Sequence, residues 1–236
     1  MVFLVGAEGA TEYFSPAMSI FWENQLAEIR NEVLRMSGLA ERNFARAAKA
    51  LMERDEAIAL EVEEADNEVD RLEVRIDDLV ITYISTHGPI AGDCRFLITA
   101  SKISNELERI ADQATTIARR TRDLNRIAAL GSLIGIPKMV EDVEWMIRQS
   151  IRALVERDTD LALEVIGKDK RVDELYRDTA RAIEAAIVAD PTTTAQELHL
   201  LTVAKAIERA GDHATNIAEE VFFLFKAEDI RHQHRA

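Results

Sequence analysis

The sequence predicts an all-α protein built as two tandem three-helix bundles that are related by internal duplication. Three observations indicate this fold class. The 236 residues include only nine glycines and four prolines, and both of these residues interrupt helices. Apolar residues recur at spacings of three and four, as in helices that bury one face. Finally, two pairs of similar segments lie about 100 residues apart, which is typical of a duplicated chain.

The duplication is clearest around two pairs of segments. Residues 50–70 and 153–173 are identical at 12 of 21 positions, and residues 108–118 and 208–218 at 7 of 11. Because the order of the segments is the same in both halves, we expect each half to form the same structural unit.

A boundary between the halves is predicted where Gly131, Gly135 and Pro137 cluster, because these residues end one helix and start another. The predicted organisation is an amino-terminal extension over 1–20, a first bundle over 21–130, a second bundle over 131–228 and a tail over 229–236.

Each half divides into three helical segments. Asp55 and Asp158 stand where helix N-caps are needed, and the breaker sequences HGPIAGD and ADPTTT separate the second and third helix of each half. Short connections of this kind join antiparallel neighbours in a bundle. The predicted helices cover residues 19–54, 56–86, 91–127, 138–157, 159–189 and 193–226.

The net charge of −14 limits the classes of partner. Proteins that bind nucleic acid normally carry a basic face, so we expect no nucleic-acid partner, and an anionic membrane surface is disfavoured for the same reason. The absence of an apolar run of about 18 residues predicts no membrane insertion. The single cysteine, Cys94, fits a reducing, cytoplasmic location.

One acidic spacing, acid-x-x-x-acid, occurs at corresponding places in both halves. Four residues turn a helix by about 400°, so both members of a pair lie on one face. In each half the two pairs are equidistant from a turn, at Pro89 or at Asp190–Pro191, so antiparallel helices would bring them together. The expected clusters are Asp66, Asp70, Glu108 and Asp112 in the first half, and Asp169, Asp173, Glu208 and Asp212 in the second.

Four neighbouring carboxylates repel each other unless they are solvated, share protons, pair with bases or hold a cation. Ligand sets made only of oxygen favour Mg, Ca, Mn or Fe, with Zn as a further candidate. We favour a metal site over the alternative, which is a solvated acidic stripe with Arg109 and Arg209 as ion-pair partners.

Two other functional classes remain open at this point, a carboxylate-bridged metalloenzyme and a metal-free helical scaffold. The sequence contains no Glu-x-x-His motif at these positions, no Gly-rich phosphate loop and no Ser/His/Asp pattern, so we expect no enzymatic activity. Glu73 and Asp77 continue the acidic stripe, but Tyr176 and Ala180 hold the equivalent places, so neither acid is counted as a ligand. His213 is expected beside the site or at the surface.

Three stretches resemble the PhoU family of phosphate-signalling regulators: LRMSGLAERNFARAAKALMERD, KDKRVDELYRD and ERAGDHATNIAEEV. The resemblance covers roughly residues 24–228 and includes all four acidic pairs. It implies two three-helix bundles, with multinuclear iron or zinc clusters held by the eight acids named above. It also implies negative regulation of the phosphate-starvation response, by contacts with the phosphate transporter ATPase subunit and a sensor histidine kinase. We further expect a homodimer.

The chain departs from the family pattern in two places. Its amino-terminal extension, the first twenty or so residues, is longer than the one we expect for the family. The first-half motif has Ala111, Gln113 and Thr116, where the second half and most of the family have Gly211, His213 and Asn216. If these side chains complete the site, the second half should hold metal better.

Overall fold

The structure, a computed structural model, describes residues 16–127 and 133–231 and consists of six α-helices in those ranges. The first half contains α1 (Pro16–Glu53), α2 (Glu56–His87) and α3 (Ala91–Asn125). The second contains α4 (Ile136–Glu156), α5 (Thr159–Ala189), the short 3-10 turn η1 (Pro191–Thr193) and α6 (Thr194–Lys226). The described part of the chain has no strand, which confirms the predicted all-α class.

The predicted helix bounds agree with the observed ones to within three residues at every end. Helix α1 already begins at Pro16, inside the predicted extension over 1–20. Residues 1–15 of that extension, Gly131 at the predicted boundary and residues 232–236 of the tail lie outside the described residues. The domain boundaries therefore stay predictions.

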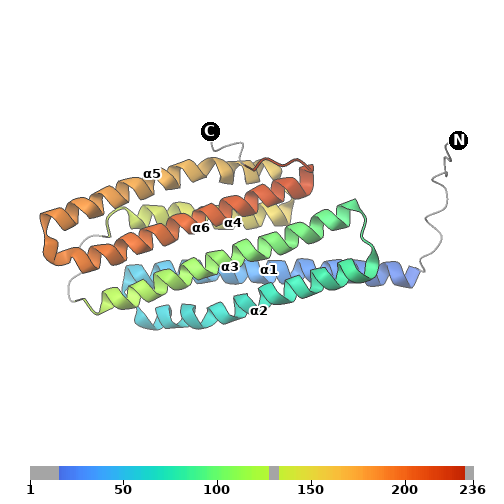
Figure 1. Ribbon diagram of the computed structural model, residues 1–236, viewed down its shortest axis with the longest axis horizontal. Coiled ribbons are helices and arrows are strands. Elements are labelled where there is room, and N and C mark those ends of the chain that lie inside the picture. The colour runs from blue at the N-terminus through green and yellow to red at the C-terminus, as the bar shows by residue number, and fades with distance from the viewer. Residues whose placement is uncertain (1–15, 128–132, 232–236) are drawn as a thin grey trace.

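The two bundles lie side by side, with α3 packed against α6 along the middle of the molecule (Figure 1). Helices α1 and α4 also touch across this seam. Among the described residues, α2 contacts only helices of the first half, and α5 contacts only elements of the second. The bundles therefore share an inner layer, and α2 and α5 are outer helices. No described helix has a stretch long and apolar enough to span a bilayer.

The turn between the first two helices has the same form in both halves. Arg54 and Arg157 both take left-handed backbone angles, with φ of 56° and 58°. The following aspartates are N-caps: Asp55 Oδ1 accepts from two backbone N–H groups of α2, and Asp158 Oδ1 accepts from two of α5, over 2.9–3.1 Å. These caps satisfy N–H groups that have no partner within the helix. The structural repeat thus extends to single turns.

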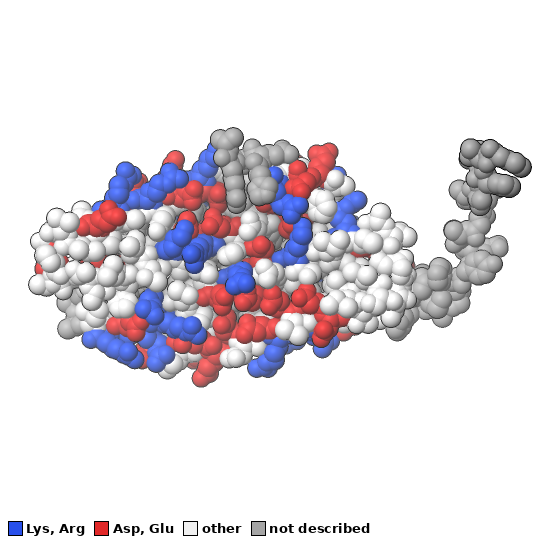
Figure 2. Space-filling model, in the orientation of Figure 1, with Lys and Arg blue, Asp and Glu red and all other residues white. Residues whose placement is uncertain are grey.

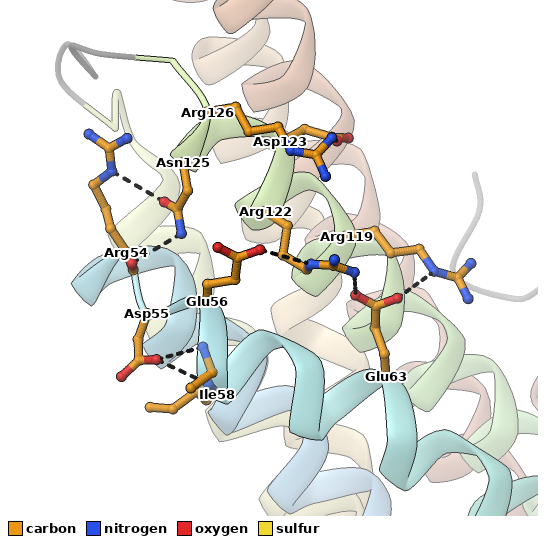
Figure 3. Close-up of polar contacts among 11 residues, drawn as sticks. Arg54, Asp55, Glu56, Ile58, Glu63, Arg119, Arg122, Asp123, Asn125 and Arg126 are labelled. Carbon is orange, nitrogen blue, oxygen red and sulfur yellow. Dashed lines mark hydrogen bonds and ion pairs between the residues drawn. The ribbon is translucent and has the colours of Figure 1, made fainter.

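Arginine side chains tie the α1–α2 turn and α2 to the end of α3 (Figure 3). Arg54 Nη2 donates to the carbonyls of Leu124 and Ile127 at 3.1 and 3.0 Å. Arg122 and Arg119 both reach Glu63 on α2, at 2.9 and 3.3 Å. Exposed ion pairs of this kind contribute little energy singly. They favour one register between α2 and α3, the two helices that carry the first acidic cluster.

Gly211 allows α6 to approach its neighbours closely. A Cβ atom at this position would lie 3.3 Å from Val143 on α4 and 3.5 Å from Val172 on α5. Ala111 occupies the equivalent place on α3 and is fully buried. The glycine therefore lets α6 lie against α4 and α5 at the level of its acidic pair.

We predict that Asp55→Ala and Asp158→Ala each lower the free energy of unfolding by about 1 kcal/mol, because each leaves helix N–H groups without an acceptor. Urea unfolding followed by circular dichroism measures the effect. Glu184→Ala, at an exposed site within α5, is the control and should change the value by less than about 0.5 kcal/mol. Equal values for all three variants would contradict the capping role.

Candidate metal centre

Three of the four acids predicted in the second half converge. Asp173 on α5 and Glu208 and Asp212 on α6 each place a carboxylate oxygen within 4.8 Å of the other two. The fourth, Asp169, lies near enough to Asp212 to raise its pKa, and its Oδ1 accepts a hydrogen bond from Thr215 Oγ1 at 3.2 Å. The hairpin of α5 and α6, which turns at Asp190 and η1, brings these positions together as antiparallel geometry requires.

The second-half cluster is partly screened by bases on its own helices. Lys205 Nζ lies 2.6 and 2.5 Å from the two oxygens of Glu208 and 5.1 Å from the ring centroid of Tyr176. Arg177 Nη2 lies 3.3 Å from Asp173 Oδ2. Burial, and then the charges of Glu208 and Asp169, raise the pKa of Asp212 to about 6. The bases therefore leave part of the repulsion uncompensated.

The first-half acids also lie close together, but more loosely. Burial, and then the charge of Asp112, raise the pKa of Glu108 to about 7. Burial also raises the pKa of Asp66, with Asp70 and Asp112 adding to the shift. Within the described ranges, these four acids do not supply three oxygens that all lie within 4.8 Å of one another. Figure 2 draws one face of the molecule and shows acidic side chains gathered in its middle, over α2 and α3.

The predicted arginine partners differ between the halves. Arg109 Nε lies 3.3 Å from Glu108 Oε2, and Arg109 Nη1 lies 3.6 Å from Asp112 Oδ2. Its counterpart Arg209 makes no ion pair with a described residue, and Lys205 takes that role instead. The alternative of a solvated stripe therefore has its predicted arginine partner in the first half but not in the second. Sequence reasoning missed Lys205, although its i,i+3 spacing to Glu208 was a usable signal.

The residues present fit a cation of the hard or borderline class. The donors are carboxylate oxygens, which such ions prefer. Glu108 Oε2 is buried and accepts no hydrogen bond from a described residue, although Arg109 Nε is nearby. Arg109 offsets part of the charge of this oxygen, and a bound cation would add to that compensation.

His213 and Asn216 do not extend the carboxylate cluster. His213 Nδ1 lies 2.7 Å from Glu106 Oε2 on α3, and Asn216 Nδ2 donates to the same oxygen at 3.0 Å. These contacts join the two halves of the molecule. Sequence analysis did not select Glu106, although Ala206 at the equivalent position showed that the repeat is broken there.

Comparisons with known proteins give one consistent family. Residues 33–121 and 136–221 match the family model of the PhoU domain. A Pseudomonas putida protein named phosphate-specific transport system accessory protein PhoU homolog is 32% identical over 97% of this chain and 88% of its own length. An Aquifex aeolicus protein of the same name is 36% identical over 92% of this chain and 97% of its own length.

Solved structures agree with this result. The crystal structure of PhoU from Pseudomonas aeruginosa has a TM-score of 0.86 at 31% identity, over 88% of this chain and all of that one. PhoU from Streptococcus pneumoniae, a phosphate transport system regulatory protein, has a TM-score of 0.81 at 20% identity, which supports the fold alone. Both repeats match the family model, and the sequence identity to these two relatives exceeds 30% over most of the chain. The chain therefore belongs to the PhoU family.

Proposed function

We propose that this chain regulates phosphate uptake as an accessory protein of a phosphate transport system, and that it acts by protein contact without turnover. The observation that carries this proposal is the match of both repeats to the PhoU domain, together with relatives whose names give this role. The proposed partners are the ATPase subunit of the transporter and a phosphate-sensing histidine kinase. The chain would act on them as a negative regulator, in the cytoplasm and as a homodimer.

The second part of the proposal is that the acidic clusters hold iron or zinc. Asp173, Glu208 and Asp212 support it, because their oxygens already converge within the reach of one ion. A bound metal would supply positive charge between α5 and α6, where Lys205 and Arg177 supply it in the metal-free chain. Asp66, Asp70, Glu108 and Asp112 would hold a second centre, and Asp169 would complete the first.

The role of such a centre follows from its position. It would link an outer helix to an inner one in each half, because each acidic pair lies on one helix of a hairpin. The metalloenzyme alternative relies on the same carboxylates and has no further observation in its favour. A metal-free scaffold is the remaining alternative, and metal analysis separates it from the proposal.

The regulatory role predicts a result in the source organism. Deletion of the gene should raise expression of a phosphate-starvation reporter in phosphate-rich medium, and the wild-type gene should restore repression. The measurement is reporter activity together with the rate of labelled phosphate uptake. Unchanged uptake and reporter activity in the deletion strain would contradict the proposed function.

The metal proposal predicts a loss of bound metal on substitution. Freshly purified, untagged wild-type protein should contain iron or zinc by elemental analysis. The triple variant Asp173→Asn, Glu208→Gln, Asp212→Asn should lose the metal of the second half, because the converging oxygens lose their charge. Glu174→Gln, an exposed neighbour on α5, is the control and should keep it. Equal metal content in all three proteins would contradict this site.

The raised pKa values predict how the metal-free protein responds to pH. The pKa of Glu108 is about 7 in the folded chain, against an ordinary value of 4.5. Between these values the folded state binds more protons than the unfolded state, so this group lowers the free energy of unfolding as the pH rises. Glu108→Gln should therefore stabilise the metal-free protein by about 1 kcal/mol at pH 8, allowing for solvent screening, and change little at pH 4.5.

Urea unfolding of chelator-treated protein at the two pH values measures the Glu108→Gln effect. Saturating zinc should reverse its sign at pH 8, because the wild-type carboxylate then has a positive partner. A variant that is equally stabilised at both pH values would show that packing, not charge, causes the change.

A further inference from the structure

A cavity of about 390 Å³ lies between the two halves, at the end of the molecule where α3 begins and α6 ends (Figure 1). Helices α1, α3, α4 and α6 all contribute to its wall, and most of the lining side chains are apolar. None of the eight acids of the proposed metal centres lines it. Sites for small molecules commonly have this size, with an apolar wall and a few polar groups.

Two arginines line this cavity, and each lies over an aromatic ring of the same wall. The guanidinium of Arg30 is 5.4 Å from the ring centroid of Phe96, and that of Arg157 is 6.0 Å from the ring centroid of Phe225. Neither guanidinium forms a hydrogen bond or an ion pair with a described residue. A ring face accepts no conventional hydrogen bond, so the N–H donors of both arginines have no acceptor in the described structure.

The repeat shows how this end of the seam between α3 and α6 differs from the opposite end. Arg54 holds the same turn position as Arg157, but its guanidinium donates to two backbone carbonyls at the end of α3. Ala100 lines the cavity, whereas the equivalent residue of the second half is Leu200, and both are buried. The cavity therefore has a smaller side chain and a less engaged arginine than the equivalent positions of the repeat.

The charge along the cavity wall is opposite in sign to that of the whole chain. Arg30 and Arg157 are lining residues, and Asp93 is the single acid among the lining residues, although the chain has a net charge of −14. Asp93 forms no ion pair with either arginine in the described structure. Burial, and then the charge of Asp93, raise the pKa of Tyr83. An anion beside the two guanidiniums would therefore gain charge-assisted hydrogen bonds that the described chain does not supply.

The composition of the wall defines the class of ligand. The apolar part favours a hydrocarbon body, because the removal of apolar surface from water stabilises the bound state. Guanidinium groups bind carboxylate and phosphate groups through paired N–H donors. The lining supplies only one carboxylate, Asp93, so a metal ion would lack ligands. A small polar anion would leave the apolar part of the wall without a partner.

We propose that this cavity binds a free amphiphilic anion, a molecule with an acyl chain and a carboxylate or phosphate head. The acyl chain lies among the apolar side chains, and the head lies against Arg30 and Arg157. Because α1 and α3 belong to one half and α4 and α6 to the other, the bound molecule contacts both halves. A free molecule is favoured over a bilayer lipid, since the acidic chain is repelled by an anionic membrane surface. This site goes beyond the proposed function and does not depend on it.

Isothermal titration calorimetry of the full-length protein tests the proposal with decanoate, at concentrations below those that form micelles. Decanol keeps the acyl chain without the charge, and decyltrimethylammonium reverses the charge. We expect decanoate and decyl phosphate to bind, and decanol to bind about 10-fold more weakly, which is the loss expected for a charge-assisted contact. The cationic amphiphile should not bind. Sedimentation with phosphatidylglycerol vesicles should leave the protein in the supernatant.

One matched pair of variants locates the acyl chain. Val155 on α4 lines the cavity and is 57% exposed, whereas Val188 on α5 is exposed outside it. Val155→Asp should weaken decanoate binding at least about 10-fold, because it places a charge in the apolar wall and a like charge near the head. Val188→Asp makes the same chemical change and should leave the affinity unchanged.

A second set of variants locates the anionic head. Arg30→Gln and Arg157→Asn should each weaken decanoate binding about 10-fold and leave decanol binding unchanged, because decanol has no charge to lose. Asn is chosen at position 157 because it tolerates the left-handed backbone found there. Arg209→Gln, at an exposed position of α6, is the control and should bind decanoate as the wild type does. Circular dichroism checks that each variant is folded.

The proposal fails if decanoate affinity is unchanged in both arginine variants, or if the two valine variants weaken it equally. Equal loss of decanol and decanoate binding in the arginine variants would show that these residues shape the cavity and do not hold the head. Binding of decyltrimethylammonium as tight as that of decanoate would show adsorption of any amphiphile. Cosedimentation with the vesicles that Arg157→Asn abolishes would assign the arginines to a membrane surface. The phosphate reporter measures regulation without an added amphiphile, so failure of this site is distinguishable from failure of the proposed function.

Discussion

The repulsion among carboxylates on neighbouring helices is the constraint on which this structure depends. Each half places two acidic pairs at matching heights on a helical hairpin, where burial and mutual repulsion raise the pKa values of Glu108 and Asp212. Such an arrangement costs stability unless another interaction offsets it. Hydrophobic packing of the bundles holds the hairpins closed, and bases next to the acids supply part of the missing charge.

The two halves offset this repulsion with different neighbouring residues, although they share one repeat. In the second half, Lys205 covers both oxygens of Glu208, and Gly211 lets α6 lie close to α4 and α5. In the first half, Arg109 is shared between Glu108 and Asp112, and Ala111 replaces the glycine. The glycine stands in the half that has the more convergent cluster. Duplication thus preserved the acids while the groups around them diverged.

Sequence reasoning predicted most of the fold because its signals are local. Helix ends followed from Asp55, Asp158 and the turn sequences, and the convergence of Asp173 with Glu208 followed from equal distance to one turn. Asp169 lies near this set but outside the group of three converging oxygens, and its Oδ1 accepts a hydrogen bond from Thr215. Residue periodicity describes one helix or one hairpin at a time. It therefore predicted the helix face on which each acid lies, but not the distances between the carboxylates.

Contacts between the halves could not be predicted in this way. The hydrogen bonds from His213 and Asn216 to Glu106 join residues more than 100 positions apart, and no repeat or turn relates them. The same holds for the cavity beside Arg30 and Arg157, whose wall combines helices of both halves. The broken symmetry at Ala206 and Glu106 was visible in the sequence, but its meaning required the packing of the two bundles.

The outer position of α2 and α5 has a mechanical consequence. Among the described residues, each contacts only its own bundle, while α3 and α6 form the layer that the two bundles share. Each acidic cluster joins one of these outer helices to a helix of the shared layer. A change of charge at either acidic cluster therefore acts first on the contact between one outer helix and the shared layer, within a single half of the molecule.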